Sequence, residues 1–257
     1  MSSDPYVLSE LQYTAPMDVE PEFYLYEPAD GTVKHEPIPD RHAVRIHDVR
    51  GRKGAISFDA DGFEYIDIDV DVAAFSDSDE VRASYYPAVA AHVKRAVGAA
   101  EVHVFDQNFC SHSVTNPGTS DRPPVVWVHN DYTEVSAPQR IRELLPDRAD
   151  AHLAKRYCFI NLWRPVTRPV EQSDFITLAL GYEDRDGQVY SSRHNPNHQW
   201  HYLSGMRPDE AVLLKFCDSA EDGRCRYTMH SAFVDPTSAA DAIPRESIET
   251  RTIAFFD

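Results

Sequence analysis

A histidine and an aspartate stand two residues apart in the segment WVHNDYT, residues 127–133, directly after the apolar run VVWV. Side chains two residues apart on a β-strand project from the same face, so His129 and Asp131 would point the same way. An imidazole, a carboxylate and one further histidine form the facial triad that holds Fe(II) and leaves positions open for a chelating cosubstrate and O2. In an aspartate-rich chain with 12 histidines, however, one His-x-Asp pair is expected about once by chance. A strand end whose polar side chains bond to nearby backbone remains the alternative.

A third ligand should lie on a strand far downstream. The segment RYTMHSAF offers His230, which shares one strand face with Arg226 and Thr228. The competing histidines lie in RHNPNHQWH. His194 and His198 fall in a loop that contains proline and asparagine, whereas His201 falls in a predicted strand and stays open as a candidate.

An iron enzyme of this kind that uses 2-oxoglutarate also needs a cation for the distal carboxylate of that cosubstrate. Arginine suits this role because its planar guanidinium binds a carboxylate through two hydrogen bonds. Arg245 and Ser247 stand at the start of the last predicted strand, in PRESIETR, and share one face with Arg251. Either arginine could hold the cosubstrate, and a surface arginine paired with Glu246 or Glu249 is the other interpretation.

The clearest helix should pack against the sheet that positions these residues. Apolar side chains recur every four residues at Val81, Tyr85, Val89, Val93 and Val97, which predicts an amphipathic helix. Ser76 and Ser78 are candidate N-caps, and Gly98 is placed to end the helix. Pro87 should kink it or split it in two.

Short strands dominate the rest of the chain. The first 42 residues show no sustained period and are expected to form an extended arm, whereas strand patterns begin at Ala43. The DADG segment, residues 59–62, predicts a hairpin turn. Further strands are predicted in AEVHVFD, VVWVHND, YCFINLW, DFITLAL, HQWHYL, AVLLKFC, CRYTMHSAF and SIETRTIAFF. Because strands follow one another without alternating helices, the pattern favours a mainly β fold, a sandwich or jelly roll with flanking helices, over a doubly wound α/β fold.

Composition narrows the class of function. The chain has 257 residues and a formal net charge of −17, so it should repel nucleic acids and anionic membranes. It has neither a signal-peptide pattern nor an apolar run of membrane-spanning length. Its four cysteines form no C-x-x-C pair and read as reduced thiols. We therefore expect a cytoplasmic protein with a small-molecule substrate, and nothing in the sequence indicates a homo-oligomer.

Several longer segments resemble one family of non-haem iron oxygenases. These are HNDYT, NLWRPV, HQWHYL, RPDEAVLLKFCDSAEDGRCRYTMHSAFVDP and PRESIETRTIAFF. The family includes the cephamycin 7α-methoxylase J component, gibberellin desaturase-like proteins and fungal meroterpenoid oxygenases. The similarity runs from about Ala43 to the C-terminus and is densest after Trp200.

The resemblance implies a cupin-like double-stranded β-helix that binds Fe(II) and uses 2-oxoglutarate and O2. It implies His129, Asp131 and His230 as catalytic metal ligands and Arg245 with Ser247 as the cosubstrate anchor. It also places Asn161 near the cosubstrate, and Arg164 near the cosubstrate or the substrate. A packed stack of Trp163 on Arg164 is the structural alternative for the latter. Residues 1–257 would form a single oxygenase domain, with 1–42 as its arm and 43–257 as its core.

Three functions remain to be distinguished. The first is an Fe(II)/2-oxoglutarate-dependent dioxygenase that hydroxylates, desaturates or cyclises a small specialised metabolite through C–H abstraction. The second is a zinc-type hydrolase with the same ligands, which would consume no O2 and would tolerate loss of Arg245. The third is a non-catalytic accessory component of a multi-component oxygenase, in which alanine at His129 would change no small-molecule turnover.

Overall fold

The computed structural model describes residues 5–19, 21, 35–70, 78–111, 126–166, 170, 189–243 and 245–257. One layer of the fold is a five-stranded antiparallel sheet in the order β3-β9-β6-β10-β4. Its strands are β3 (Phe63–Asp67), β9 (Glu210–Asp218), β6 (Tyr157–Pro165), β10 (Glu246–Phe255) and β4 (Glu101–Ser111). The three central strands β9, β6 and β10 are buried almost throughout, as expected for strands that are covered on both faces.

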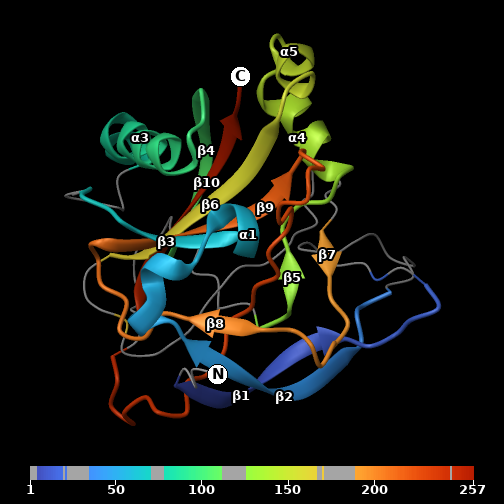
Figure 1. The fold of residues 1–257 in the computed structure, drawn as a ribbon, viewed down its shortest axis with the longest axis vertical. Coiled ribbons are helices and arrows are strands. Elements are labelled where there is room, and N and C mark those ends of the chain that lie inside the picture. The colour runs from blue at the N-terminus through green and yellow to red at the C-terminus, as the bar shows by residue number, and fades with distance from the viewer. Residues whose placement is uncertain are drawn as a thin grey trace.

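A second layer of strands faces this sheet, and Figure 1 shows it below the five-stranded sheet. It contains β1 (Tyr6–Thr14), β2 (Pro39–Asp48) and β8 (Trp200–Tyr202), in the order β1-β2-β8, and the pair β5 (His129–Asn130) and β7 (Tyr190–Ser191). A hydrogen bond of 2.8 Å from the Val128 N–H to the Gln12 carbonyl joins β1 to the segment that leads into β5. The chain is thus predominantly β with flanking helices, as the sequence predicts.

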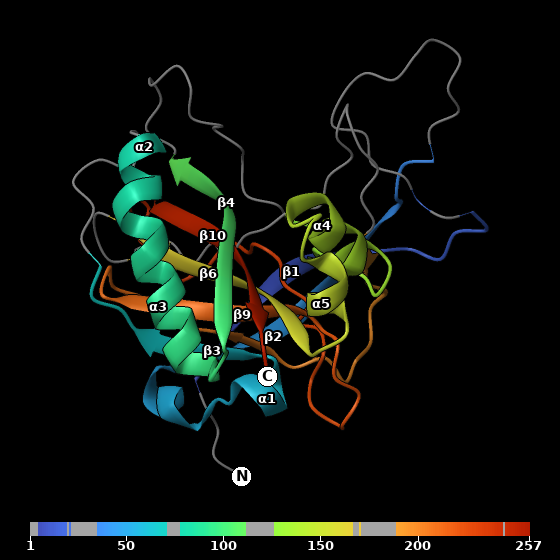
Figure 2. The same ribbon diagram turned by 90° about the horizontal axis from the view of Figure 1, so that it is seen from above.

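The predicted helix covers the outer face of the five-stranded sheet (Figures 1 and 2). It begins as α2 (Ser78–Glu80), passes through a π-helical turn at Val81–Tyr85 and continues as α3 (Tyr86–Val97). Pro87 lies in the first turn of α3, directly after the π-helical turn. The chain stays helical from Ser78 to Val97, so the helix is not split in two, and the irregularity next to Pro87 is the π-helical turn. Gly98 ends α3 in the left-handed conformation at φ 68°.

The remaining helices are short. A 3-10 segment, η1 (Arg50–Ala55), and α1 (Phe58–Asp61) connect β2 to β3, while α4 (Ser136–Leu144) and α5 (Ala149–Leu153) lead from β5 to β6. The hairpin turn predicted at DADG is wrong, because Ser57 caps α1 through a hydrogen bond from the Ala60 N–H and Gly62 ends it at φ 81°. No helix in the described ranges has the length and apolar character needed to cross a membrane.

Two other expectations need correction. The supposed extended arm contains β1, which pairs with β2 along its whole length and buries Val7, Leu11 and Tyr13 on one side. Val7, Leu11 and Tyr13 all lie an even number of residues apart, as expected for one face of a strand, and this spacing is visible in the sequence. The strand predicted for CRYTMHSAF is mostly irregular chain that makes a single bridge at His230. The strand predicted for DFITLAL lies outside the described residues.

Three apolar clusters hold the layers together. The first lies on the inner face of the five-stranded sheet, against α4, and includes Phe159, Trp163 and Phe216. The second lies between the outer face of that sheet and α3, and the third lies between β1, β2, β8 and Phe233. The helix residues Val81, Tyr85, Val89 and Val93 are fully buried in the second cluster, and Val97 packs at its margin. Alternate residues of β6 and β10 therefore separate cleanly into an inner and an outer set.

A buried carboxylate ties the β2–β3 connection to the five-stranded sheet. Glu210, the first residue of β9, is 2% exposed and accepts hydrogen bonds from Arg50 Nη1 at 2.5 Å and Lys53 Nζ at 3.2 Å. Its second oxygen accepts the Arg207 N–H at 2.9 Å. Burial alone would raise the pKa of Glu210, but the bonds from Arg50, Arg207 and Lys53 outweigh it and lower the pKa to about 2.

We expect Glu210→Gln to lower the free energy of unfolding by about 2 kcal/mol at pH 7, because it removes one charge from a buried ion cluster. The folded pKa of Glu210 lies below the ordinary value of 4.5, so its contribution is complete above pH 4.5 and is lost as the pH falls towards about 2. Urea denaturation should therefore show a smaller difference between variant and wild type at pH 3 than at pH 7. Glu221→Gln, at an exposed pair with Arg226, is the control. A difference that is equal at both pH values would contradict the prediction.

Candidate active site

The three residues proposed as metal ligands lie together in the structure. Asp131 Oδ1 is 3.5 Å from His129 Nε2 and 3.7 Å from His230 Nε2, and the two imidazole centroids are 4.2 Å apart. One ligand atom from each residue lies within 4.8 Å of the others, and all three side chains are buried. The spacing of these atoms suits a single cation.

Backbone pairing brings the two histidines to one face. The His129 N–H donates to the His230 carbonyl at 3.1 Å, and the His230 N–H donates to the His129 carbonyl at 2.9 Å. Residues that exchange both hydrogen bonds across an antiparallel bridge project on the same side, so the two imidazoles meet. Asp131 follows two residues after His129 and points to the same place.

Both imidazoles are held with the same nitrogen toward the centre. Nδ1 of His129 lies 2.6 Å from the Trp127 carbonyl, and Nδ1 of His230 lies 3.3 Å from the Thr228 carbonyl. A carbonyl only accepts, so each Nδ1 carries the proton and each Nε2 presents a lone pair. This is the tautomer that a metal-binding histidine needs.

Three buried polar atoms at this centre have no hydrogen-bond partner among the described residues. They are His129 Nε2, His230 Nε2 and Asp131 Oδ1. Buried polar atoms are nearly always paired, so three converging acceptors without donors fit a bound cation. Burial lowers the pKa of His129 to about 4 and that of His230 well below its ordinary value, and it raises the pKa of Asp131 to about 6 against the opposing charge of Arg251. Both histidines are thus neutral at pH 7 and able to bind a metal.

The second oxygen of Asp131 is held by the five-stranded sheet. Asn161, on β6, donates from Nδ2 to Asp131 Oδ2 at 3.2 Å and also to Glu249 Oε1. Arg251, on β10, places Nε 3.3 Å from Glu249 Oε1 and 3.9 Å from Asp131 Oδ2, and its Nη1 bonds to Asp106 at 2.8 Å. Asn161 was expected near a cosubstrate, and its polar contacts are instead with two carboxylates.

Glu249 is a site residue that sequence reasoning missed. It was considered only as a surface partner of Arg245, yet it is 3% exposed and lies on the inner face of β10. Burial raises the pKa of Glu249 to about 8, against the charge of Arg251. The two-residue period of a strand could have identified it, because Glu249 projects from the same face of the strand as Ser247 and Arg251.

Arg245 and Ser247 also face inward, at the start of β10. Both are buried, at 3% and 1% exposure, so Arg245 is not a surface residue. The Arg245 guanidinium lies 5.3 Å from the centroid of the Trp163 ring. The Ser247 hydroxyl is a buried group without a hydrogen-bond partner in the described part of the chain.

Arg164 lies on the wrong face of β6 for the expected role. It stands three residues after Asn161, so it projects from the outer face, where Nη1 donates to the Val70 carbonyl at 2.9 Å and the guanidinium lies 5.9 Å from the Tyr85 ring. The suggested stack of Trp163 on Arg164 is not found either, because Trp163 packs in the inner cluster and Arg164 faces α3. We therefore exclude Arg164 from the site.

The competing histidines lie elsewhere. His194 and His198 pack around Tyr13, and His194 stacks on His42 with centroids 3.8 Å apart. His201, on β8, packs against Phe63 at 5.7 Å and belongs to the lining of a cavity. Of the four histidines considered as third ligand, only His230 lies beside His129 and Asp131.

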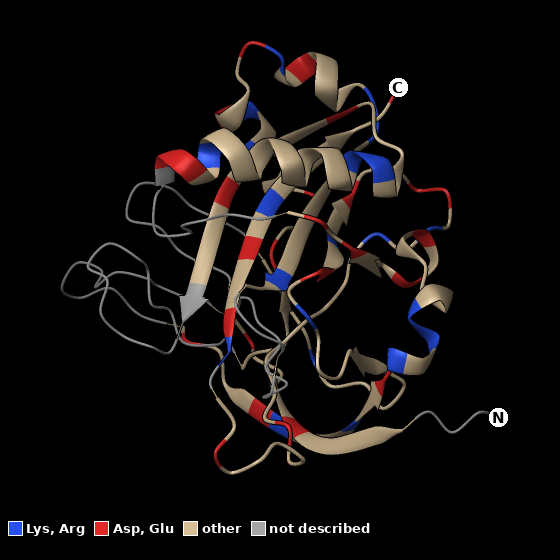
Figure 3. Ribbon diagram, turned by 90° about the vertical axis from the view of Figure 1, so that its left-hand side faces the viewer, with Lys and Arg blue, Asp and Glu red and all other residues tan. Residues whose placement is uncertain are grey.

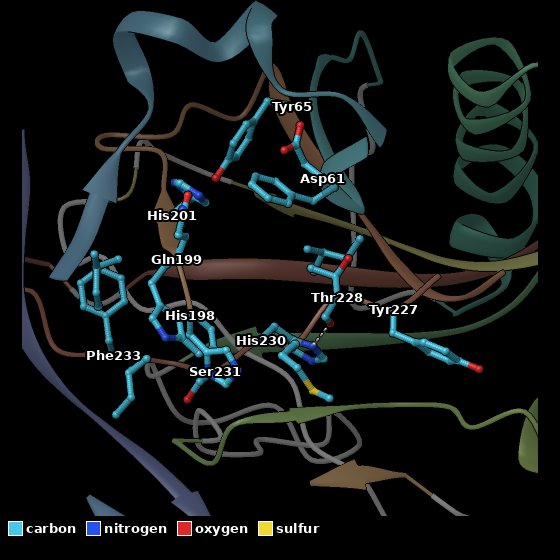
Figure 4. Close-up of a pocket in the computed structure, with 16 residues that line it drawn as sticks. Asp61, Tyr65, His198, Gln199, His201, Tyr227, Thr228, His230, Ser231 and Phe233 are labelled. Carbon is cyan, nitrogen blue, oxygen red and sulfur yellow. Dashed lines mark hydrogen bonds between the residues drawn. The ribbon is translucent and has the colours of Figure 1, made fainter. Parts of the chain in front are cut away.

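A cavity of about 210 Å³ reaches His230 from the side of β8 (Figure 4). Figure 4 shows His230 in its wall, with His198, Ser231 and Phe233 on one side and Asp61 and Tyr65 on the other. Aromatic and aliphatic side chains form most of the lining, and Asp61 is its only aspartate, glutamate, lysine or arginine among the described residues.

Known proteins provide independent evidence about this chain. A family model described as oxidoreductase/YMDC permease-like domain matches residues 11–255. The hydroxylase/desaturase efuI of Hormonema carpetanum is 30% identical over 91% of this chain and 93% of its own length. The hydroxylase/desaturase CTB9 of Cercospora beticola is 31% identical over 85% of this chain and 78% of its own length. The Fe(II)/2-oxoglutarate-dependent dioxygenase nvfI of Aspergillus novofumigatus is 28% identical over 91% of this chain and 90% of its own length.

Solved structures agree with these relatives. The iron and alpha-ketoglutarate-dependent endoperoxidase NvfI, in a structure described as having a different conformation, superposes with a TM-score of 0.86 at 26% identity. That superposition covers 99% of both chains. A second structure of NvfI gives a TM-score of 0.85 over 98% of both chains. The extent of these matches, and the buried cluster of two histidines and one aspartate, identify the chain as a member of the non-haem iron, 2-oxoglutarate-dependent oxygenase family that includes these hydroxylase/desaturases.

Proposed function

We propose that this protein oxidises a small specialised metabolite, with Fe(II) bound by His129, Asp131 and His230. The observation that carries the proposal is the convergence of three buried ligand atoms within 4.8 Å, each lacking a hydrogen-bond partner among the described residues. A hydrolase with the same ligands would suit this geometry equally, but membership of the oxygenase family favours iron, 2-oxoglutarate and O2.

We further propose that the two strand layers form a double-stranded β-helix and that residues 1–257 constitute one oxygenase domain. The facing layers and the inner apolar cluster support this arrangement. In this proposal β1 and the start of β2 belong to the smaller layer of the domain and not to a separate arm.

The residues of the chain prepare the site for its chemistry. Bound Fe(II), together with 2-oxoglutarate and O2, supplies an oxidant that can remove a hydrogen atom from an unactivated C–H bond. His129, Asp131 and His230 would hold the ion through one ligand atom each, and a site with three protein ligands can also accept 2-oxoglutarate and O2. The buried inner face of the sheet excludes bulk water from the reacting groups.

Arg245 is our proposed anchor for the distal carboxylate of 2-oxoglutarate, with Ser247 beside it. Both face inward, and a guanidinium with a neighbouring hydroxyl suits a carboxylate. Arg251 is the alternative, but its guanidinium already contacts Asp106 at 2.8 Å and Glu249 at 3.3 Å. We assign Arg251 to the framework behind Asp131.

The substrate is proposed to be an uncharged or weakly charged small molecule. The cavity that reaches His230 is mostly apolar, and its described lining contains no lysine or arginine that would attract an anion. The net charge of −17 disfavours polyanions such as nucleic acids. The relatives include hydroxylase/desaturases and an endoperoxidase, so hydroxylation, desaturation and ring formation are all compatible outcomes.

Anaerobic titration of the apoprotein with Fe(II) and 2-oxoglutarate should produce a weak visible charge-transfer band near ~500 nm, because the keto acid chelates the open positions of a facial triad. His129→Ala should abolish the band by removing one of three ligands. His92→Ala replaces an imidazole on α3, at the outer face of the five-stranded sheet, and should leave the band unchanged. An unaltered band in His129→Ala would overturn the assignment of the ligands.

Arg245→Leu should raise the concentration of 2-oxoglutarate needed for half of this band by about 10- to 100-fold, because hydrogen bonds between two charged partners are lost. Its affinity for the metal alone should stay close to that of the wild type, since Arg245 is not one of the three proposed ligands. The same titration on Arg251→Leu is the comparison. If Arg251→Leu weakens 2-oxoglutarate and Arg245→Leu does not, the anchor is Arg251.

A further inference from the structure

We propose that Glu249 is a positioning residue for the metal centre. Through Asn161 it holds the Asp131 carboxylate so that Oδ1 alone faces the two histidines. The inference rests on the proposed function, because it assumes that His129, Asp131 and His230 bind the ion.

One amide group joins the two carboxylates. Asn161 Nδ2 bonds to Asp131 Oδ2 at 3.2 Å and to Glu249 Oε1. An amide NH2 carries two hydrogens and can serve two acceptors at once, whereas the amide oxygen could not bond to the acceptor oxygen of Asp131. Glu249 therefore selects the orientation of Asn161 that presents a donor to Asp131.

The strand register fixes this arrangement. Asn161 on β6 pairs with Arg251 on β10, and Glu249 lies two residues earlier on the same inner face. Asn161 is 1% exposed and Glu249 is 3% exposed, so bulk water does not compete for these bonds. The side chains of β10 beyond Arg251 on this face, Ile253 and Phe255, are apolar.

Burying a carboxylate is costly, and a well-packed apolar residue would often serve stability better. A buried carboxyl group at position 249 therefore points to a role beyond packing. Figure 3 shows acidic and basic positions within the strands beneath the covering helix as well as in the loops.

Glu249 also influences the nearest cation. Arg251 Nε lies 3.3 Å from Glu249 but 3.9 Å from Asp131, and Asp106 holds its Nη1 at 2.8 Å. The guanidinium is thus engaged by Glu249 and Asp106 and does not form a close pair with Asp131. The lone pairs of Asp131 Oδ1 remain directed at the histidines.

The consequence concerns how many positions Asp131 would occupy on the ion. With Oδ2 bonded to Asn161, the carboxylate can offer one oxygen. If it rotated and offered two, it would take a position that a chelating keto acid and O2 need. Partners behind a ligand that fix its orientation typically change metal affinity by about 10- to 100-fold when mutated.

The test compares two substitutions with opposite chemistry. Glu249→Asp keeps the carboxyl group but withdraws the acceptor from Asn161 by one methylene group, whereas Glu249→Gln replaces the carboxyl group by an amide but keeps an acceptor in place. Co(II) binding to each apoprotein is followed by visible absorption, which reports metal affinity and ligand geometry without turnover. We expect Glu249→Asp to weaken Co(II) by about 10- to 100-fold and to alter its spectrum, and Glu249→Gln to remain within about threefold of the wild type.

The reverse order would overturn the inference, because it would mean that Glu249 acts through its carboxyl group and not through its contact with Asn161. Glu246→Asp and Glu246→Gln are the matched controls on the opposite parity of β10, and both should bind Co(II) as the wild type does. If the wild type itself binds no Co(II), the proposed function fails. If the wild type and Glu249→Asp bind it equally, only the positioning role fails.

Asn161→Leu supplies a second route should Glu249→Asp not fold. It removes the shared donor at similar volume and should weaken Co(II) by the same factor as Glu249→Asp. Because Glu249 is proposed to act through Asn161, adding the damaging change Glu249→Asp to Asn161→Leu should cause no further loss. Wild-type affinity in Asn161→Leu, or a further loss in the double variant, would overturn the inference.

Discussion

The pair of backbone hydrogen bonds between His129 and His230 is the constraint on which the site depends. It joins two segments that are far apart in the sequence, and it brings both imidazoles to one side of an antiparallel bridge. The same backbone supplies the Trp127 and Thr228 carbonyls that turn each Nε2 inward. This one pairing therefore determines the position, the tautomer and the orientation of two of the three proposed ligands.

The third proposed ligand, Asp131, lies next to a group of charged side chains that the five-stranded sheet supplies. Asp131, Glu249 and Asp106 surround Arg251, so one cation is shared among three carboxylates of which two are buried. Such a cluster is costly without a further positive charge, and a divalent ion at Asp131 would supply it. The apolar clusters on either side keep this network dry, which strengthens each of its interactions.

The relatives indicate that the residues proposed to bind the metal and the residues that line the substrate cavity have separate roles. Proteins called hydroxylase/desaturases and an endoperoxidase share similarity with this chain over most of its length. A framework of the kind seen at His129, Asp131 and His230 is compatible with all of these reactions. The course of the reaction depends on where the substrate carbon lies, so the walls of the cavity beside His230 are where differences of outcome should arise.

The sequence by itself determined which side chains share a strand face and where the main helix lies. Parity grouped His129 with Asp131 and Arg245 with Ser247, and it also shows that Arg164 cannot share a face with Asn161. Only the tertiary structure decided that His230 rather than His201 completes the cluster, and that Glu249 is buried behind Asp131. The physical reason is that the period of a strand fixes which residues project together, whereas the face that turns inward and the segment that lies opposite depend on long-range pairing.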